Sequence, residues 1–423
     1  MLMSSRTRII ETINHRKTDV LPIDFGAMRS TGINAMAYNR LKDYLGFQGE
    51  PAKIYDIFQQ LAEPELAIMD RLGGDVVQAH RLMPAWGIRI DTWRPGRLQD
   101  GSACLYPNDF QPVTNRQGDL EIRDSGRVIA RMPAGGYYFD QIIHPYEHVA
   151  SFEDIDQIPI EEITDEELDF IEKEVHELYE KTDKAILLCF GGNILEAGQI
   201  NWGYEKFFAD MALNPDLVHY WLTKLTDAYM RDLAKLLARV GDQVNVIQFG
   251  DDLGTQEAPQ ISPAMYREMI KPYHARQYQF VRNHYPDVKV FMHSCGAIFD
   301  LIPDLIDAGV EILNPVQISA RGMDPKKLKR EFGKHLTFWG GGADMQHTVV
   351  NGSIETISRE VRELIDIFAQ DGGYVFNQVH NIQADISPEK ILAIYDTALA
   401  YRQEQMKEPS RSCKEVRHDL PRL

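Results

Sequence analysis

The sequence predicts an α/β protein built as a closed TIM-type (β/α)8 barrel. From about Lys184 onward, short apolar runs that favour strands alternate with longer segments of helical period, which is typical of βα units around a parallel sheet. Two further short runs lie upstream, so the expected strands reach the eight that a closed barrel needs. Prolines next to capping residues mark the starts of several intervening helices.

The expected strands are short and separated by helical segments. Two lie in the first part of the chain, at 21–25 and 75–78. The other six follow in order at 185–190, 244–249, 288–292, 310–313, 336–339 and 374–379.

Three helix starts carry the same signal. Asn214, Ser262 and Ser387 each precede a proline, and each side chain can cap a helix whose first turn tolerates the missing proline N–H. The segment 215–239 then shows apolar residues about one turn apart, which predicts a helix packed on the sheet. These residues are Leu217, Val218, Trp221, Leu222, Leu225, Met230 and Leu233.

The pattern of residue types changes between residues 84 and 140. Turn formers such as Pro95-Gly96, Asp100-Gly101 and Gly135-Gly136 separate short alternating runs, which predicts an antiparallel β insertion. The acidic stretch 152–183 carries Leu168, Ile171, Val175 and Leu178 at helical spacing, and we expect an amphipathic helix there.

We expect one barrel domain over residues 1–404, including the insertion at 84–140, followed by a polar C-terminal tail at 405–423. Hydrophobic residues make up 44% of the 423, enough for a large core. The 45 basic and 63 acidic residues leave a net charge of −18, which argues against nucleic-acid and membrane partners. Four scattered cysteines, together with the lack of a signal-like or membrane-spanning segment, predict a cytoplasmic protein with reduced thiols.

The segment 291–296 holds the most informative residue pair. His293 and Cys295 follow a predicted strand, at the rim where barrel enzymes carry their active sites. Two positions apart on an extended chain, both side chains point to the same side, so one metal ion can take an imidazole nitrogen and a thiolate. A buried cysteine beside a satisfied core histidine is the structural alternative.

His380 also follows a predicted strand, the one at 374–379. Taken alone, it suits a general acid or hydrogen-bond donor. Together with His293 and Cys295 it completes three ligands of a catalytic zinc site that keeps one position open.

Asp251 and Asp252 end another predicted strand. Side chains of adjacent residues diverge, so one carboxylate can face the barrel mouth while the other caps backbone nearby. The glycine-rich segments 191–193 and 340–344 allow close approach of a ligand but lack the residues of a phosphate-binding loop.

The order and spacing of several segments resemble the uroporphyrinogen decarboxylase superfamily. They include the His293-Ser-Cys-Gly run, Gly309 to Pro315, Lys329 with Phe332-Gly333, Trp339 to Asp344, His380 to Gln383, Gly250 to Gly254 and the helix opened by Asn214-Pro215. The resemblance is strongest from about 185 to 400 and implies a TIM-type barrel with its pocket at the carboxyl ends of the strands.

The superfamily has two main branches. Its decarboxylases carry two arginines after the first strand that bind substrate carboxylates, whereas this sequence has Arg29 alone in the corresponding segment 25–32. Its cobalamin-linked methyltransferases bind zinc through a His-x-Cys pair and a later third ligand, usually Cys. Here the pair is His293 and Cys295, and the later position is His380, a residue type that the decarboxylases also have there.

The resemblance therefore implies a zinc-dependent methyltransferase with His293, Cys295 and His380 as ligands and Glu196 as a candidate fourth. Zinc would lower the pKa of an acceptor thiol, and methylcobalamin or a corrinoid protein would carry the methyl group. His380 is also a candidate catalytic residue, with Asp251 and Asp252, which would orient the substrate or the ligands. The candidate substrate-binding residues are Arg29, Asn314, Gln317, Asp344 and Gln383.

Two other functions stay open. One is metal-free decarboxylation of a tetrapyrrole, and the other is a non-catalytic barrel that binds a corrinoid or tetrapyrrole. A small-molecule substrate is expected for either enzyme, and a homodimer is the default assembly.

Overall fold

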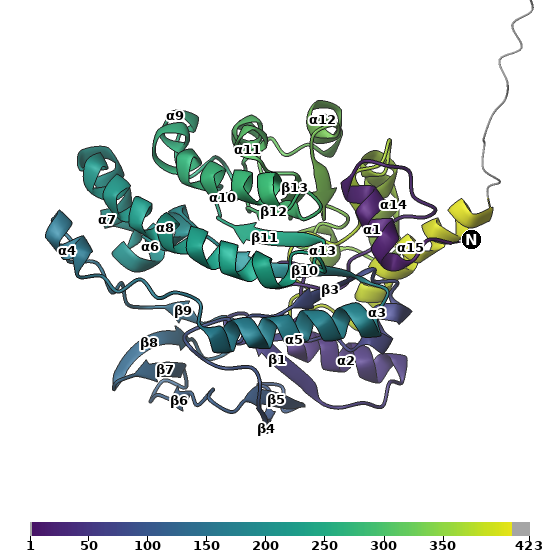
Figure 1. Ribbon diagram of the computed structural model, residues 1–423. Helices are drawn as coiled ribbons and strands as arrows, with labels where there is room; N and C mark the ends of the chain where they lie inside the picture. The colour runs from purple at the N-terminus through teal and green to yellow at the C-terminus, as the bar shows by residue number, and fades with distance from the viewer. Residues whose placement is uncertain (1, 408–423) are drawn as a thin grey trace, which may run out of the picture.

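A parallel sheet of seven strands forms the wall of a barrel in the computed structural model, which describes residues 2–407. The strands lie in the order β15-β14-β13-β12-β11-β10-β3 and curl around a common core (Figure 1). Each matches one of the predicted runs. Their bounds are β3 (Val76–Ala79), β10 (Ala185–Gly191), β11 (Val246–Gly250), β12 (Lys289–His293), β13 (Ile312–Asn314), β14 (Thr337–Trp339) and β15 (Tyr374–Val375).

The segment 21–25 occupies the eighth position and closes the barrel. Phe376 donates its backbone N–H to Pro22 and accepts one from Asp24, both at 2.9 Å. On the other side, the N–H of Asp75 donates to the carbonyl of Ile23 at 2.7 Å. The pairing between this segment and the chain after β15 is limited to one parallel bridge, from Ile23 to Phe376, because Pro22 has no N–H to extend the ladder of hydrogen bonds. The predicted fold class is confirmed.

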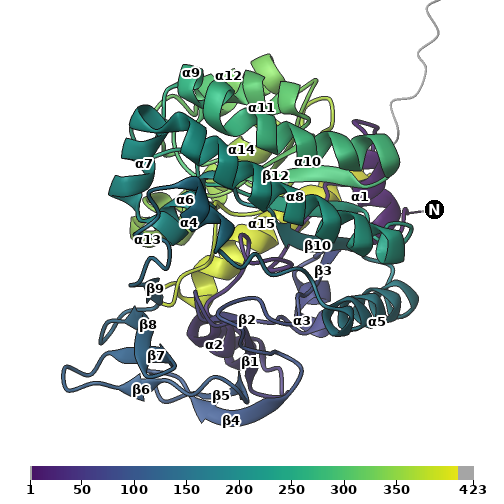
Figure 2. The ribbon, with the colours of Figure 1, turned by 60° about the vertical axis from the view of Figure 1, so that its left-hand side comes forward.

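Helices surround the sheet (Figure 2). The predicted helix at 215–239 is α8 (Pro215–Val240), and its predicted stripe is buried except for Met230. The other helices of the barrel are α1 (Ser5–Ile13), α2 (Ala35–Leu45), α3 (Leu66–Arg71), α6 (Leu195–Trp202), α7 (Tyr204–Leu213), α9 (Pro263–Met265), the π-helix η1 (Tyr266–Ile270), α10 (Lys271–His284), the 3-10 helix η2 (Phe299–Leu301), α11 (Ile302–Ala308), α12 (Pro325–Phe332), α13 (Thr348–Asn351), α14 (Ile354–Phe368) and α15 (Pro388–Lys407).

The cap predicted for Asn214 is wrong. Its side chain accepts no hydrogen bond from the first turn of α8, and its amide instead donates to Asp210 at 2.8 Å. The cap predicted for Ser262 is present, because its hydroxyl accepts from the N–H of Met265.

The single helix predicted at 152–183 is also wrong. The structure has two helices, α4 (Phe152–Asp156) and α5 (Asp165–Lys181), separated by a segment that contains Pro159. Proline removes a helical donor and clashes with the preceding turn, and Thr164 then caps the second helix. Part of the predicted stripe, including Leu168, Ile171 and Val175, is buried on α5.

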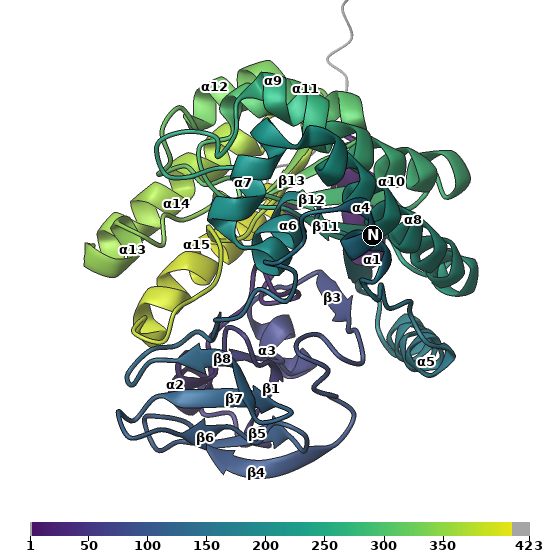
Figure 3. The ribbon, with the colours of Figure 1, turned by 90° about the vertical axis from the view of Figure 1, so that its left-hand side faces the viewer.

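The antiparallel insertion lies below the barrel in Figure 3. Its two four-stranded sheets have the orders β2-β1-β5-β4 and β6-β7-β8-β9. The insertion starts earlier than predicted, since β1 and β2 precede residue 84 and β1 pairs in parallel with β5. The bounds are β1 (Ala52–Asp56), β2 (Leu61–Ala62), β4 (Trp93–Arg97), β5 (Ala103–Pro107), β6 (Val113–Thr114), β7 (Leu120–Asp124), β8 (Arg127–Met132) and β9 (Asp140–Gln141).

Helix α15 continues to Lys407, three residues into the segment 405–423 predicted as a tail. Arg402 on this helix is buried, and its Nε donates to the carbonyl of Leu21 at 2.5 Å. The rest of the predicted tail, 408–423, lies outside the described residues. None of the helices between residues 2 and 407 combines the length and apolar character that crossing a bilayer requires.

Candidate metal centre

His293, Cys295 and His380 come together at the carboxyl ends of the barrel strands. His293 ends β12, Cys295 lies two residues later, and His380 follows β15. One ligand atom from each residue lies within 4.8 Å of the others, and Sγ of Cys295 is 3.4 Å from Nε2 of His293. An imidazole pair and a thiol this close together can converge on one divalent ion.

Asn314, at the end of β13, holds His293 from behind. Its amide nitrogen donates to the carbonyl of Trp339 at 2.9 Å, which directs its oxygen toward Nδ1 of His293, 2.6 Å away. An oxygen can only accept, so Nδ1 carries the ring proton. Nε2 is left with its lone pair on the side of Cys295, as a metal ligand needs.

The three residues His293, Cys295 and His380 are called the metal group below. The surroundings of this group leave two of its members, Cys295 and His380, uncharged in the absence of a cation. Burial, reinforced by Asp252 and Glu196, raises the pKa of the Cys295 thiol well above its ordinary value. Burial and then the nearby His293 lower the pKa of His380 to about 4. A bound divalent ion would supply the positive charge that stabilises the thiolate.

Asp251 and Asp252 have different positions, as their adjacency predicts. Asp251 is fully buried, and its carboxylate accepts the backbone N–H groups of Ile194, Leu195 and Glu196 at 2.7 to 3.1 Å. Nε2 of His274 lies 3.0 Å from it. The carboxylate of Asp251 thus anchors the start of α6 and does not line the barrel mouth, where we had also predicted a catalytic role for it.

Asp252 faces the mouth. Its Oδ1 accepts the backbone N–H of Cys295 at 2.8 Å and lies 3.8 Å from Nε2 of His293. It therefore positions the loop that carries Cys295 and adds negative charge beside the group.

Glu196 is not brought into the three-residue group among the described residues. Its Oε2 accepts from the amide of Asn193 at 2.6 Å. Burial first, and then Asp252 and Asp251, raise the pKa of Glu196 to about 8, so this carboxyl is protonated at neutral pH. The predicted role of Glu196 as a fourth ligand stays a prediction.

A cavity of about 630 Å³ opens at this rim and is lined by His293, His380, Asp252 and Glu196. The sequence analysis did not predict most of the other residues that line this cavity. Its aromatic lining residues are Phe58, Trp86, Tyr138, Tyr229 and Phe249, and its uncharged polar ones include Gln59, Gln141, Asn193 and Gln248. Gln248 and Cys189 lie near the carboxyl ends of predicted strands, which was a usable signal. Trp86 and Tyr138 come from the insertion, where no pattern marked them.

The predicted substrate-binding residues are spread over different environments. Arg29 lines the cavity and forms an ion pair with Asp56. Gln383 reaches the cavity through Tyr138, to whose hydroxyl its amide donates at 2.6 Å. The remaining three candidates, Asn314, Gln317 and Asp344, are not among the described residues that line this cavity.

These three hold local structure. Asn314 is fully buried behind His293, as described above. Gln317 accepts the N–H of Gly296 at 2.7 Å, and Asp344 accepts that of Gln346 at 2.9 Å. Their side chains bind groups within the protein and do not line the cavity, so the predicted contact of these three residues with a substrate stays a prediction.

Comparison with known proteins adds the family. The family model described as Uroporphyrinogen decarboxylase (URO-D) matches residues 139–401, well over half of the chain. The chain belongs to the uroporphyrinogen decarboxylase family. The match covers β10 to β15 and most of α15, including all three residues of the group.

Curated members of the uroporphyrinogen decarboxylase family are similar at low identity. The chain is 26% identical over 257 residues to a uroporphyrinogen decarboxylase of Chlorobium limicola, covering 57% of this chain and 68% of that protein. It is 24% identical over 315 residues to the one of Chlorobium phaeobacteroides, covering 71% of this chain and 80% of that protein.

Among solved structures, a methyltransferase from Methanosarcina mazei aligns over 95% of this chain and 99% of its own, with a TM-score of 0.57 and 16% identity. At that identity the likeness concerns the fold. It includes the parts of the chain outside the uroporphyrinogen decarboxylase match, and it agrees with the barrel described above.

Proposed function

We propose that this protein is a zinc-dependent methyltransferase that moves a methyl group between a corrinoid carrier and a thiol or similar acceptor. The observation that supports this proposal is the convergence of His293, Cys295 and His380 within 4.8 Å, where two of them, His293 and His380, line the cavity. Two imidazoles and a thiolate are typical zinc ligands, and three protein ligands leave one position for a substrate. A zinc ion held there would supply the charge that keeps an acceptor thiol as its nucleophilic thiolate.

The protein's own groups would perform the remaining tasks. Asn314 holds the ring of His293 with Nε2 toward the cavity, and Asp252 fixes the backbone of Cys295. Glu196, whose Oε2 accepts from Asn193 and whose pKa burial raises to about 8, would donate a proton to a substrate atom. A substrate packed against the aromatic side chains that line the cavity would displace water, which would strengthen each of these electrostatic interactions.

Metal analysis of the purified protein tests this proposal. We expect about one zinc per chain in the parent protein, and loss of zinc and of methyl transfer in His293→Ala and Cys295→Ala. Cys189→Ala is the matched control, because Cys189 lines the same cavity but is not a member of the group. Retention of zinc by both ligand variants would overturn the proposal.

Decarboxylation of a tetrapyrrole is the second candidate, favoured by the names of the curated relatives. The cavity fits this reaction less well. Arg29 is the only arginine or lysine among the described residues that line it, and Asp56 already neutralises it. Asp252 adds a carboxylate, which a substrate rich in carboxylates would meet. Decarboxylation that continues unchanged after chelation of metal would favour this candidate over methyl transfer.

A further inference from the structure

A second cavity, of about 650 Å³, opens on the opposite face of the barrel. It lies among three connections that lead into strands, namely those before the segment 21–25, before β14 and before β15. Helices α1, α12 and α14 lie next to these connections (Figure 1). The amino ends of the strands meet on this face, whereas the metal group follows their carboxyl ends. The two sites are therefore separate.

The charges of this cavity are opposite to those of the whole protein. Four basic side chains, those of Lys326, Lys329, Arg330 and Lys334, line it against one acidic side chain, that of Asp371. Across the chain, acidic residues outnumber basic ones by 63 to 45. A local excess of cations in such a protein concentrates positive potential in one concave place.

Most of these cations lack a carboxylate partner. Lys326 and Lys334 are exposed and form no ion pair with any described residue. Lys329 is partly buried, and its ammonium donates to the backbone carbonyl of Gly372 at 2.6 Å. Arg330 alone is paired, with Glu331 at 3.1 Å. The cavity thus presents several ammonium donors that are available to an anion.

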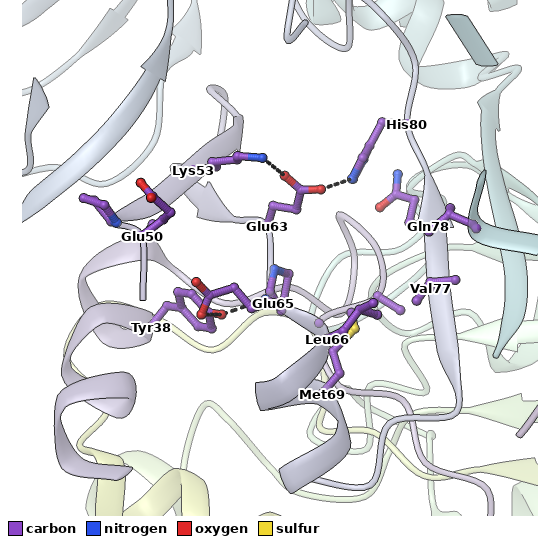
Figure 4. Close-up of a pocket in the computed structure, with 16 residues that line it drawn as sticks. Tyr38, Glu50, Lys53, Glu63, Glu65, Leu66, Met69, Val77, Gln78 and His80 are labelled. Atoms are coloured by element: carbon purple, nitrogen blue, oxygen red, sulfur yellow. Dashed lines mark hydrogen bonds and ion pairs between the residues drawn. The ribbon is translucent and has the colours of Figure 1, made fainter. Parts of the chain in front are cut away.

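In another cavity, on the outside of the barrel between α2, α3 and β3, acidic side chains lie beside the basic ones (Figure 4). There the carboxylate of Glu63 lies 3.8 Å from both Nζ of Lys53 and Nε2 of His80. Lys42, close by, pairs with Glu65 at 2.8 Å. The unpaired cations are therefore a property of the cavity lined by Lys326, Lys329 and Lys334 and not of every cavity on this protein.

We propose that the cavity formed around Lys326, Lys329 and Lys334 binds a small soluble molecule through its phosphate group. Lysine ammonium groups bind phosphate as point charges, and several of them around one concavity suit a multiply charged anion. A volume of about 650 Å³ is in the range of small-molecule sites and leaves room for more than a phosphate alone.

Calorimetric titration with pyrophosphate tests this proposal at an ionic strength held constant with sodium chloride. The parent protein is expected to bind, and Lys326→Glu and Lys334→Glu are each expected to weaken binding by about tenfold or more. Both side chains are exposed, so both variants should fold. Lys173→Glu is the matched control, since Lys173 lies exposed on α5, outside this cavity, and should keep the parental affinity within about twofold.

A thermal-unfolding series provides an independent readout. Pyrophosphate should raise the unfolding temperature of the parent and of Lys173→Glu but not that of the two cavity variants. Absence of binding by the parent, or equal binding by all four proteins, would overturn the proposal. Vesicles that contain phosphatidylglycerol separate the two sources of phosphate. Binding to them that Lys334→Glu abolishes, without any binding of pyrophosphate, would also overturn it, because the ligand would then be a lipid.

Discussion

The side-chain oxygen of Asn314 lies 2.6 Å from Nδ1 of His293, while its amide nitrogen is held by the carbonyl of Trp339. The amide of Asn314 therefore cannot turn without losing one of these contacts. This relationship fixes the tautomer of His293 from a residue that is fully buried and does not line the cavity. Supporting groups of this kind orient a ligand and tune its basicity.

Asn314→Ala should therefore weaken zinc binding about 10- to 100-fold, because His293 would lose the acceptor that orients its ring. Competition with a chromophoric chelator measures this affinity. Asn193→Ala serves as a control, since Asn193 lines the cavity and holds Glu196 but contacts none of the three ligands. Parental zinc affinity in Asn314→Ala would contradict the orienting role.

The neighbouring acids Asp251 and Asp252 should respond differently to removal. Asp251→Ala leaves three backbone N–H groups at the start of α6 without their acceptor and is expected to lower the free energy of unfolding by about 3 kcal/mol. Asp252→Ala should change that free energy by only about 1 kcal/mol but reduce zinc affinity and turnover. Urea unfolding and metal titration of both variants check this contrast, and equal losses of stability would refute it.

Asp75 connects the two ends of the described chain. Its carboxylate pairs with Arg8 at 2.6 Å and with Arg402, and all three side chains are buried. Asp75→Ala would leave two buried guanidinium groups without this partner and should lower the free energy of unfolding by about 3–5 kcal/mol. Asp396→Ala, which breaks an exposed pair with Arg71, should change it by about 1 kcal/mol or less. Chemical denaturation measures both, and similar small effects would contradict the structural role of Asp75.

Asp24 should make stability depend on pH. It is fully buried, Trp339 donates to it at 2.8 Å, and burial raises its pKa from 3.8 to about 6. Between these values the folded protein binds the proton more tightly than the unfolded chain does, so the contribution of Asp24 to stability decreases as pH rises. The stability difference between the parent and Asp24→Asn should thus fall by roughly 2 kcal/mol from about pH 4 to about pH 7. A difference that stays constant over this range in urea unfolding would contradict the raised pKa.

The sequence was sufficient to predict the barrel because parallel strands buried on both faces are continuous apolar runs. The runs at 185–190 and 288–292 correspond to β10 and β12 within one or two residues. The strands β1 and β2 were missed, since each is too short to show an alternating pattern. The break between α4 and α5 was missed because apolar residues continue at helical spacing on both sides of Pro159.

The sequence predicts the site residues that directly follow strands. It does not predict those whose position depends on tertiary contacts. His293, Cys295 and His380 follow β12 and β15, so the rim of a barrel brings them together. The distinct positions of Asp251 and Asp252 followed from their adjacency, but which one faces the mouth depends on the start of α6. The sequence predicts that Asn314 binds a substrate and does not reveal its contact with His293. That contact is made between two neighbouring strands, and a linear pattern does not show which residues face each other there.

The closure of the barrel by the segment 21–25 has a consequence for biosynthesis. Gln405 and Arg402 hold Leu21 from almost 400 residues away, and Phe376 supplies the neighbouring strand. During translation this early segment has no partner on one side until the ribosome has released the last βα unit. Nascent chains should therefore expose an open sheet edge for most of their synthesis, which makes this protein a candidate client of chaperones that shield such edges.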